Sequence, residues 1–496
     1  MTNIDSDTNK LRKCVTAYGT NDGNVDSNID RKTPENFFKV TKANRFFGIG
    51  IAYFGIIVLY AQNSCYWTSI WPFLRQTDKQ VVESFLGFVA AAYSFGMFIS
   101  APVIGYWSNR IKQTRLPIIC GMIINIGGNI MITFVQSVSH NQRWMLLAAR
   151  FVAGIGGGCL GTLQAYVAMA SSYEERNIAM AFVSAAMSLG IVAGPALQAA
   201  FVPIGFPGFT YRPYFHFNMY TAPAFLNILL VLILVAGLVL VYKEYYVDII
   251  DDEPNQSKNE KFLPYDRLAA VICIWLRFVM MFSVSYTETI STAFSIAMFN
   301  WSNETAVFWN SLNQALGGAV DFLGNIAIGA YVLKYIKERT TMAIGLVFLL
   351  SFFVMSFPWP GLYLPDPTSN DITNGCTYSW CSYMPRVGVA QFFVGFQMLV
   401  LASASGFGTN TTLFSKVLGP TRQGFMQGIY TGAGGLAMTI SSIVVSILFE
   451  HQGPRVTWAL AMVMVSLSLM VVAVFYTRLI PYRDMVKLQE DKKAQK

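Results

Sequence analysis

Residues 220–242 read YTAPAFLNILLVLILVAGLVLVY, a stretch of 23 residues without a charged side chain. A helix of about 20 such residues spans the hydrocarbon core of a lipid bilayer. Eleven other mostly apolar stretches of comparable length occur along the 496-residue chain. The sequence therefore predicts an all-α membrane protein with twelve transmembrane helices. The predicted spans are 46–70, 84–107, 116–137, 144–170, 178–202, 220–242, 268–293, 306–333, 341–358, 387–413, 424–449 and 456–477.

The composition indicates that lipid, and not water, surrounds most of the chain. Hydrophobic residues make up 54% of it and charged residues only 12%, whereas soluble proteins carry about 25% charged residues. The net charge of +8 could suggest a nucleic-acid partner. The basic residues, however, lie mainly in loops and tails between the apolar spans, where the orientation of membrane helices explains them. We therefore expect membrane lipid around the protein and no nucleic acid.

The distribution of Lys and Arg predicts that both termini face the cytosol. In this orientation 27 of the 35 Lys and Arg residues lie on the cytosolic side, 6 on the opposite side and 2 within spans, as the positive-inside rule requires. The polar stretch 243–267 separates two sets of six spans, a plan typical of secondary transporters. The expected segments are a disordered cytosolic tail without a cleavable signal peptide (1–45), a six-helix bundle (46–242), a cytosolic loop (243–267), a second six-helix bundle (268–477) and a cytosolic tail (478–496).

Two features fall on the predicted non-cytosolic side. Cys376 and Cys381 lie in the loop 359–386, where an oxidising compartment would permit a disulfide between them; two unpaired thiols are the alternative. Asn300 and Asn303 each begin an Asn-x-Ser/Thr sequence after the seventh span. Both are therefore predicted glycosylation sites.

Three short motifs occur in order at the second, fourth and fifth spans. They are Gly105-Tyr-Trp-Ser-Asn109-Arg110, Arg150-Phe-Val-Ala-Gly154-Ile-Gly156-Gly157 and Gly190-Ile-Val-Ala-Gly194-Pro195. Together they resemble signatures of the major facilitator superfamily, which implies its two-bundle fold and a gating loop at Gly105, Asn109 and Arg110. The superfamily commonly has an acidic residue at the position of Asn109. A charge relay through that position therefore cannot operate in this chain.

A more specific resemblance extends over nearly the whole chain. It rests on Asn218-Met-Tyr-Thr221-Ala-Pro223, Glu288-Thr289, Asn374-Gly-Cys376, Trp380-Cys381, Ser415-Lys416-Val-Leu-Gly419-Pro420, Gln423-Gly424, Gly428 and Gly453-Pro454-Arg455. These motifs are similar to those of the lysosomal ceroid-lipofuscinosis type 7 group, the relatives of major facilitator domain-containing protein 8. The resemblance implies a multi-pass protein of the endolysosomal membrane, with the plasma membrane as the alternative. It also implies solute transport or, alternatively, anion (chloride) conduction.

An arginine within the fourth span indicates a polar path through the protein. Arg150, Gly154, Gly157, Gly161 and Gln164 fall on one stripe of this helix, at about 100° per residue. Because an Arg stays charged and is costly in lipid, it needs an aqueous cavity or a partner on another helix. We expect Arg150 to face a cavity, and a structural pair between two helices is the alternative.

The seventh and eighth spans extend this predicted path. Arg277 and Glu288 share one face of the seventh span, about 16 Å apart along its axis. Glu288 and Asp321 are candidate proton-coupling groups, because burial changes the proton affinity of a carboxyl group; a fixed hydrogen bond between helices is the alternative. The eighth span carries a polar stripe formed by Asn310, Asn313, Gln314, Gly317, Asp321, Gly324 and Asn325. The predicted cavity residues are Arg150, Gln164, Arg277, Glu288, Asn310, Gln314, Asp321 and Asn325.

The fifth span is expected to have a packing role. Gly190, Gly194 and Pro195 would allow this helix to bend and to approach a neighbouring helix closely.

Two main functional classes remain open at this stage. A carrier would rock its two halves around a small, possibly anionic solute, whereas an anion-conducting pore would use Arg150 and Arg277 as a positive lining. A membrane scaffold without transport activity is a third class. The chain has no Gly-x-x-x-x-Gly-Lys-Ser/Thr loop, and its three histidines lack metal-ligand spacing. We therefore predict neither an enzyme nor a bound cofactor or metal.

Overall fold

The computed structural model describes residues 34–77, 83–138, 141–211, 215–247, 264–301, 303–360, 378–382 and 384–494. The chain forms two compact units, Met1–Asn44 and Arg45–Lys496. Helix α2 begins in the first unit, and all the other described helices and strands belong to the second. Its first half comprises α2 (Pro34–Thr77), α3 (Glu83–Ile111), α4 (Arg115–Thr133), η1 (Val135–Ser137), α5 (Gln142–Gly157), α6 (Leu160–Ala170), α7 (Arg176–Phe201), η2 (Val202–Ile204), the strands β1 (Phe209–Tyr211) and β2 (Phe215–Phe217), and α8 (Ala222–Leu240).

The second half is also built of helices. It comprises α9 (Arg267–Phe299), α10 (Asn303–Ala327), the π-helical turn η3 (Ile328–Val332), α11 (Leu333–Tyr335), α12 (Glu338–Ser356), η4 (Ser379–Ser382), α13 (Val389–Ala402), the π-helical turn η5 (Ser403–Gly408), α14 (Thr409–Leu418), α15 (Gly424–Val474) and α16 (Tyr482–Ala494). The strands β1 and β2 pair antiparallel, with Phe209 opposite Phe217.

The described helices supply the twelve predicted spans. Among the described residues, eleven helical segments are long and apolar enough to cross a membrane. One of them, α15, has 51 residues in two arms and therefore supplies two of the twelve predicted spans. The arms meet at Gly453, whose φ of 73° is incompatible with a continuous helix, and Pro454 follows directly. The side chain of Trp380 lies against this bend and donates a hydrogen bond from Nε1 to the Phe449 carbonyl at 2.8 Å.

The fourth predicted span is one candidate membrane span, Gln142–Ala170, with a short irregularity at Gly158 and Cys159 between α5 and α6, where the run Gly154-Ile-Gly-Gly-Gly158 weakens the helix. The structure differs from the predicted segments at the first of them. The segment 1–45, predicted to be a disordered tail, already contains helix from Pro34 onward. Proline is compatible with the first turn of a helix, and the following residues contain no Gly or Pro before Gly48. Residues 1–33 lie outside the described ones.

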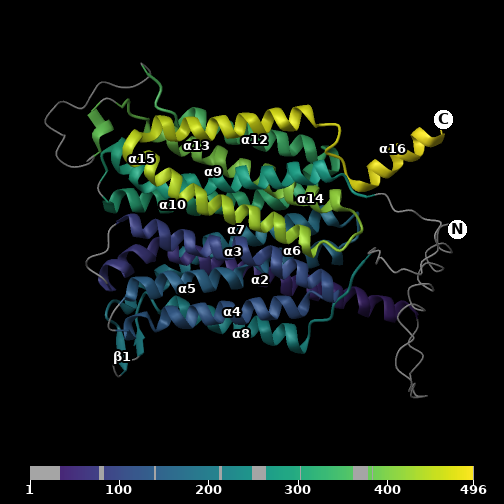
Figure 1. The fold of residues 1–496 in the computed structure, drawn as a ribbon, viewed down its shortest axis with the longest axis horizontal. Coiled ribbons are helices and arrows are strands. Elements are labelled where there is room, and N and C mark those ends of the chain that lie inside the picture. Colours follow the sequence, from purple (N-terminus) through teal and green to yellow (C-terminus); the bar gives the residue numbers. More distant parts are fainter. Residues whose placement is uncertain are drawn as a thin grey trace. The chain divides into compact units, whose positions relative to one another are not determined.

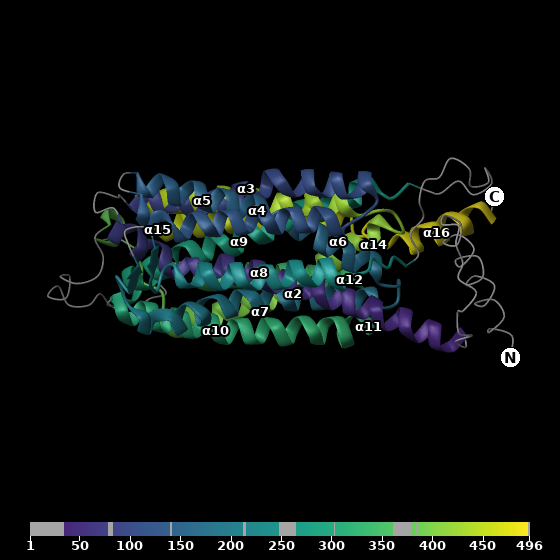
Figure 2. The same ribbon diagram turned by 90° about the horizontal axis from the view of Figure 1, so that it is seen from below.

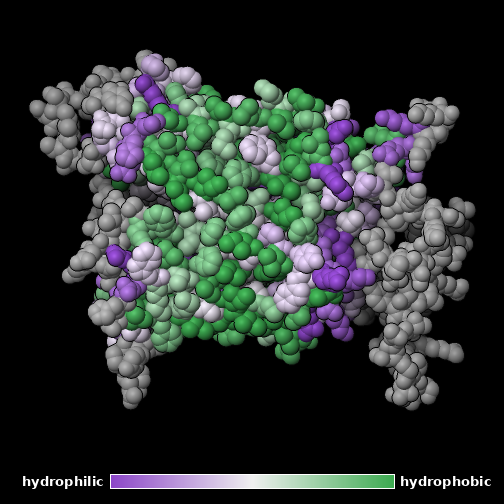
Figure 3. Space-filling view, viewed as in Figure 1, coloured by the Kyte–Doolittle hydropathy of each residue, from purple (hydrophilic) through white to green (hydrophobic). Residues whose placement is uncertain are grey.

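The two halves form two bundles of roughly parallel helices (Figures 1 and 2). They pack together mainly through α3 and α6 against the first arm of α15 and through α7 against α10. We call the end of the helices that carries β1 and β2 the hairpin end, and the opposite end the basic end. The basic end carries α16 and the connecting segments 112–114, 171–175, 336–337 and 419–423. Figure 3 shows apolar surface between these two ends, as expected of a protein embedded in lipid.

Glycines allow close approach where α5 crosses α3. A Cβ atom placed on Gly154 would lie 2.8 Å from the Tyr93 Cα atom, closer than real Cβ contacts. Gly127, in the middle of α4, has no atom within 4 Å of such a Cβ. Gly154 and Gly127 are therefore both helical glycines, but an added Cβ atom would meet close neighbours only at Gly154.

We predict that Gly154→Ala destabilises the protein by about 1–3 kcal/mol, because the added methyl group forces the two helices apart. The control Gly127→Ala should be neutral or should stabilise the protein by about 0.4–1 kcal/mol, since alanine restricts the unfolded chain. Thermal unfolding of the purified variants in detergent would measure both effects. Equal transition temperatures for the two variants would show that the crossing is not packed as described.

Candidate functional site

Arg150, on the third turn of α5, is buried with only 2% of its surface exposed. Its Nη2 atom donates a hydrogen bond to Asn63 Oδ1 of α2 at 2.9 Å. Its guanidinium lies over the rings of Tyr66 and Tyr93, with centroid distances of 5.1 and 4.8 Å. The Nε and Nη1 atoms have no hydrogen-bond partner among the described residues. The side chain is thus fixed by one amide and two rings.

Arg277, on α9, has a similar environment in the second half of the chain. It is also 2% exposed, and its guanidinium lies 4.0 Å from the Phe407 ring centroid and 4.9 Å from that of Tyr430. The hydroxyl groups of Tyr60 and Tyr430 lie within hydrogen-bonding reach of it. Its Nε and Nη1 atoms also have no partner among the described residues.

Neither guanidinium forms an ion pair with a carboxylate of the described residues. Arginine stays protonated in proteins, and an isolated buried charge is costly. Contacts with aromatic faces offset part of that cost, by about 2 kcal/mol when water is excluded. Each site therefore retains positive charge and two unused hydrogen-bond donors, a combination that attracts an anion.

Aromatic side chains connect the two arginines. Tyr93 lies over Arg150 and is also close to Tyr60, and Tyr60, on α2 of the first half, reaches Arg277 of the second half. The sequence analysis pointed to the two arginines, but not to Tyr66, Tyr93, Phe407 or Tyr430. These rings come from α2, α3, η5 and α15, so no periodicity within one helix reveals them.

The predicted polar stripe of α10 divides into two parts. Near the hairpin end, Asn310 exchanges hydrogen bonds with Ser295 of α9, and Asn313 accepts one from Gln397 of α13 at 2.8 Å. These two residues hold helices of the same half together. Further along the helix, Gly317 and Gly324 also pack against their own half, next to Val400 and Ala404, whereas Asp321 contacts the first half.

Asp321 links the two halves through its carboxylate. Ser188 of α7 donates a short hydrogen bond to Asp321 Oδ2, while Oδ1 has no partner among the described residues. Asn325, one turn further, donates to the Asp321 carbonyl at 2.8 Å and lies against Gly408. Asp321 is therefore the acidic side chain on this face of α10 that contacts the first half directly.

The other predicted cavity residues have different surroundings. Gln164 of α6 accepts a hydrogen bond from Thr431 of α15 at 3.4 Å, which also links the halves. Gln314 and Glu288 are half-buried, and no described residue hydrogen-bonds to the Glu288 carboxylate.

The predicted gating loop lies at the basic end, where α3 meets α15. Gly105 packs directly against Gly424, and Asn109 Nδ2 donates a hydrogen bond to the Arg422 carbonyl at 3.2 Å. Arg422 in turn donates from Nη1 to the Lys112 carbonyl at 2.9 Å. Arg110 is exposed. The neutral Asn109 thus makes a contact between the halves without any charge relay.

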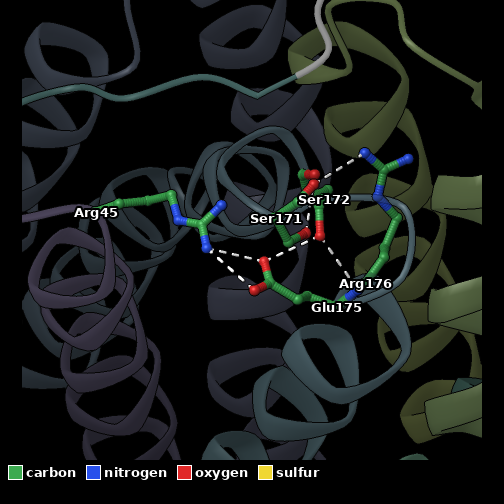
Figure 4. Close-up of polar contacts among 6 residues, drawn as sticks. Arg45, Ser171, Ser172, Glu175 and Arg176 are labelled. Atoms are coloured by element: carbon green, nitrogen blue, oxygen red, sulfur yellow. Dashed lines mark hydrogen bonds and ion pairs between the residues drawn. The ribbon is translucent and has the colours of Figure 1, made fainter. Parts of the chain in front are cut away.

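The connection between α6 and α7 is fixed to α2 at the same end (Figure 4). Arg45 Nη2 donates to Glu175 Oε2 at 2.9 Å and to Oε1 at 3.2 Å. Ser172 Oγ donates to Glu175 Oε2 at 3.0 Å, and Arg176 Nη2 donates to the Ser171 carbonyl at 3.3 Å. These bonds hold the segment 171–175 in place.

The remaining predicted residues lie away from the arginines. Gly190 and Gly194 pack against α2, where a Cβ atom on Gly194 would lie 2.5 Å from the Ala61 carbonyl oxygen, and Pro195 lies within the continuous helix α7. Cys381 is disulfide-bonded, and Cys376, its predicted partner, lies outside the described residues. Asn300 is exposed at the end of α9, and Asn303 begins α10.

Lys416 of α14 and Glu338 of α12 form a buried ion pair within the second half. Their Nζ and Oε1 atoms are 2.6 Å apart, and the side chains are 5% and 12% exposed.

We predict that Lys416→Met costs about 3–5 kcal/mol of stability, because it leaves an unpaired buried carboxylate. The double variant Lys416→Met/Glu338→Gln should recover most of this loss in a thermal unfolding assay. Arg45→Met is the control, since its partner Glu175 is 40% exposed and the loss should be about 0–1 kcal/mol.

Two six-helix bundles with buried polar groups at their boundary define the class of two-bundle membrane transporters. The sequence profile of the Major Facilitator Superfamily matches residues 52–384, and the chain belongs to this superfamily. It is 30% identical over 476 residues to Major facilitator superfamily domain-containing protein 8 of Xenopus laevis, a match that covers 88% of this chain and 92% of that protein.

Solved structures share this fold at low sequence identity. The human organic anion transporter MFSD10 (TETRAN) has a TM-score of 0.59 and 14% identity, covering 86% of this chain and 99% of that one. The proton:xylose symporter XylE has a TM-score of 0.61 and 14% identity, covering 89% of this chain and 97% of that one. The fold predicted from the sequence, two bundles of the major facilitator type, is confirmed.

Proposed function

We propose that the protein is a secondary transporter for a small anionic solute, which it moves by rocking its two halves around the tyrosine-flanked arginines. The observation that carries this proposal is the burial of Arg150 and Arg277 without a carboxylate partner. One arginine belongs to each half, and each keeps two free donors. An anion between them would gain charge-assisted hydrogen bonds, which are worth about 1.5–3 kcal/mol each.

One comparison supports an anionic solute, and both support transport. MFSD10, which shares the fold, is described as an organic anion transporter, and XylE is described as a proton:xylose symporter. In the present chain, the halves make close contacts at the basic end, which in our proposal close that side of the path. A carrier requires such a closed side, whereas a pore conducts only after it opens.

An anion-conducting pore is the second candidate function. The same two arginines would supply its positive lining, and the resemblance to the lysosomal ceroid-lipofuscinosis type 7 group implies anion conduction as an alternative to transport. The two functions differ in a measurable way, because a pore passes a continuous current down a chloride gradient.

We further propose that the basic end faces the cytosol and that the protein resides in the endolysosomal membrane. The excess of Lys and Arg at this end supports the orientation. The resemblance to a lysosomal group supports the location. An acidic lumen would then supply protons to a carboxyl group in the path.

Asp321 is the proposed proton-coupling residue. Its carboxylate connects α10 to Ser188 of the other half, and one of its oxygens has no partner. A negative charge there is costly in a buried setting, so proton binding would change the contact that joins the halves. Glu288 is the second proposed proton-coupling group, because its carboxylate is half-buried and makes no hydrogen bond to a described residue.

The function can be tested with purified protein in lipid vesicles, using uptake of a panel of radiolabelled organic and inorganic anions. We predict that Arg150→Gln and Arg277→Gln each lower uptake at limiting solute by about 10–100-fold, since each removes charge-assisted hydrogen bonds to the solute. Arg339→Gln is the matched control, because Arg339 also lies over a ring, that of Tyr476, but away from the arginine pair. Its uptake should equal that of the wild type.

Electrical recording from the same vesicles under a chloride gradient distinguishes the two candidates. A sustained current that reverses at the chloride potential and is lost in Arg150→Gln would favour the pore over the carrier. Uptake that saturates without such a current would favour the carrier. Normal uptake of every anion by both arginine variants would contradict the anion site itself.

Replacement of Asp321 tests proton coupling separately from solute binding. We predict that Asp321→Asn abolishes the acceleration of uptake by a pH gradient, because the amide cannot exchange a proton. Solute exchange without a net gradient should persist within about threefold, since the amide can still accept the hydrogen bond from Ser188. Uptake by Asp321→Asn that still follows the pH gradient would exclude this residue and direct the same test to Glu288→Gln.

A further inference from the structure

Tyr173 lies in the segment 171–175 at the basic end and belongs to the first half of the chain. Its ring faces two cations of the second half, Lys416 with Nζ 5.0 Å from the ring centroid and Arg483 with Cζ 5.3 Å from it. Both distances are within the range of cation–π attraction. Tyr173 therefore joins one half to both α14 and α16 of the other.

Tyr173 and Lys416 are each held in place by an ion pair within their own half. The ion pair between Arg45 and Glu175 fixes the segment that carries the tyrosine (Figure 4), and the buried ion pair with Glu338 fixes Lys416. The contact between the halves is thus made by preformed groups, and its formation requires little further ordering of side chains.

Helix α16 is attached to the protein through its first turn. The ring of Tyr482 packs against Gly419, whose φ of 69° accommodates a tight turn, and Arg483 follows directly. The later turns border a cavity of about 530 Å³ between α16 and the start of α12. Its lining includes Lys337, Leu479, Asp484, Lys487, Leu488 and Asp491. The cavity leaves room for the later turns of α16 to move.

A second cation–ring contact strengthens the closure at this end. Arg422 of the second half lies 5.4 Å from the ring centroid of Tyr246 in the first half. Because Asn109 carries no charge, the cationic contacts described at this closure are those of Lys416 and Arg483 with Tyr173, of Arg422 with Tyr246 and of Arg422 with the Lys112 carbonyl.

We propose that Tyr173, Lys416 and Arg483 form a latch that holds the basic end closed, and that α16 must release Tyr173 before this end can open. A latch presupposes the alternating access proposed above. The distance measurement described below needs no transported solute, so the latch and the transport function can fail separately.

The latch should not respond to pH in the physiological range. Burial, together with the neighbouring carboxylates of Asp484 and Glu338, raises the pKa of Tyr173 to about 12, although Arg483 and Arg176 act in the opposite direction. The phenol therefore stays protonated below that pH, and its ring keeps the neutral form that attracts the two cations.

The test is a distance measurement by pulsed electron spin resonance on the full chain. Spin-labelled non-natural amino acids would replace Lys243 and Lys337, which are exposed and lie in different halves at the basic end, so that the native cysteines stay in place. We expect Tyr173→Leu to shift the population from short to long distances, with the closed-to-open ratio reduced about tenfold. Arg483→Gln should give part of this shift, and Tyr173→Phe, which keeps the ring, should give none.

Tyr476→Leu is the matched control, because it removes a cation–π contact with Arg339 at 4.2 Å that lies within one half. Thermal unfolding of each variant in detergent identifies any variant that does not fold. If Tyr173→Leu does not fold, the change in distance in Arg483→Gln decides whether the latch exists. The latch is overturned if folded Tyr173→Leu and Arg483→Gln both give the wild-type distances. It is equally overturned if Tyr476→Leu opens the basic end as much as Tyr173→Leu does.

Discussion

The arrangement of the helices depends on two positive charges that are buried without negative partners. Placing a guanidinium inside a protein costs several kcal/mol unless its surroundings compensate. Here aromatic faces and one amide provide that compensation, from the first half for Arg150 and from the second half for Arg277, and the Tyr60 hydroxyl group reaches Arg277 from the first half. The same constraint explains nearby glycines. A Cβ atom on Gly434 would lie 3.0 Å from Arg277 Nε, and one on Gly157 would lie 2.7 Å from the Tyr93 hydroxyl oxygen.

The closure at the basic end uses a different kind of interaction. It combines close glycine contacts, a neutral hydrogen bond from Asn109, a charge-assisted one from Arg422 and cation–ring contacts. Each cation–ring contact is worth about 0.5–1 kcal/mol at a partly exposed site, whereas breaking a buried ion pair costs about 3–5 kcal/mol. The buried pair of Lys416 and Glu338 lies within one half and stays intact when the halves separate. Strong contacts thus hold each bundle together, and weaker contacts join the bundles.

The sequence predicted the helices well, because each span must be apolar over about 20 residues. It also identified Arg150 and Arg277, since a charge within an apolar span is conspicuous. It did not predict the short irregularity between α5 and α6 or the start of α2 at Pro34, because glycine content and helix propensity are weak signals beside hydropathy. The stripe of α10 was found as one feature, yet Asn310 contacts its own half and Asp321 contacts the other. Only the packing of neighbouring helices separates these two roles.

The free energy that the proposed latch contributes to closure is similar in size to the binding free energy that a solute can gain at the arginine pair. A solute can change the balance between two states only through a difference in its affinity for them. If the latch raises the ratio of closed to open protein about tenfold, a difference of about 1.4 kcal/mol between the solute's binding free energies for the two states is enough to offset it. One charge-assisted hydrogen bond, made to Arg150 or Arg277 in the open state alone, supplies about that amount. In the proposed mechanism, an anion bound at the arginines therefore releases the distant latch without touching it, because both act on the same motion of the two halves.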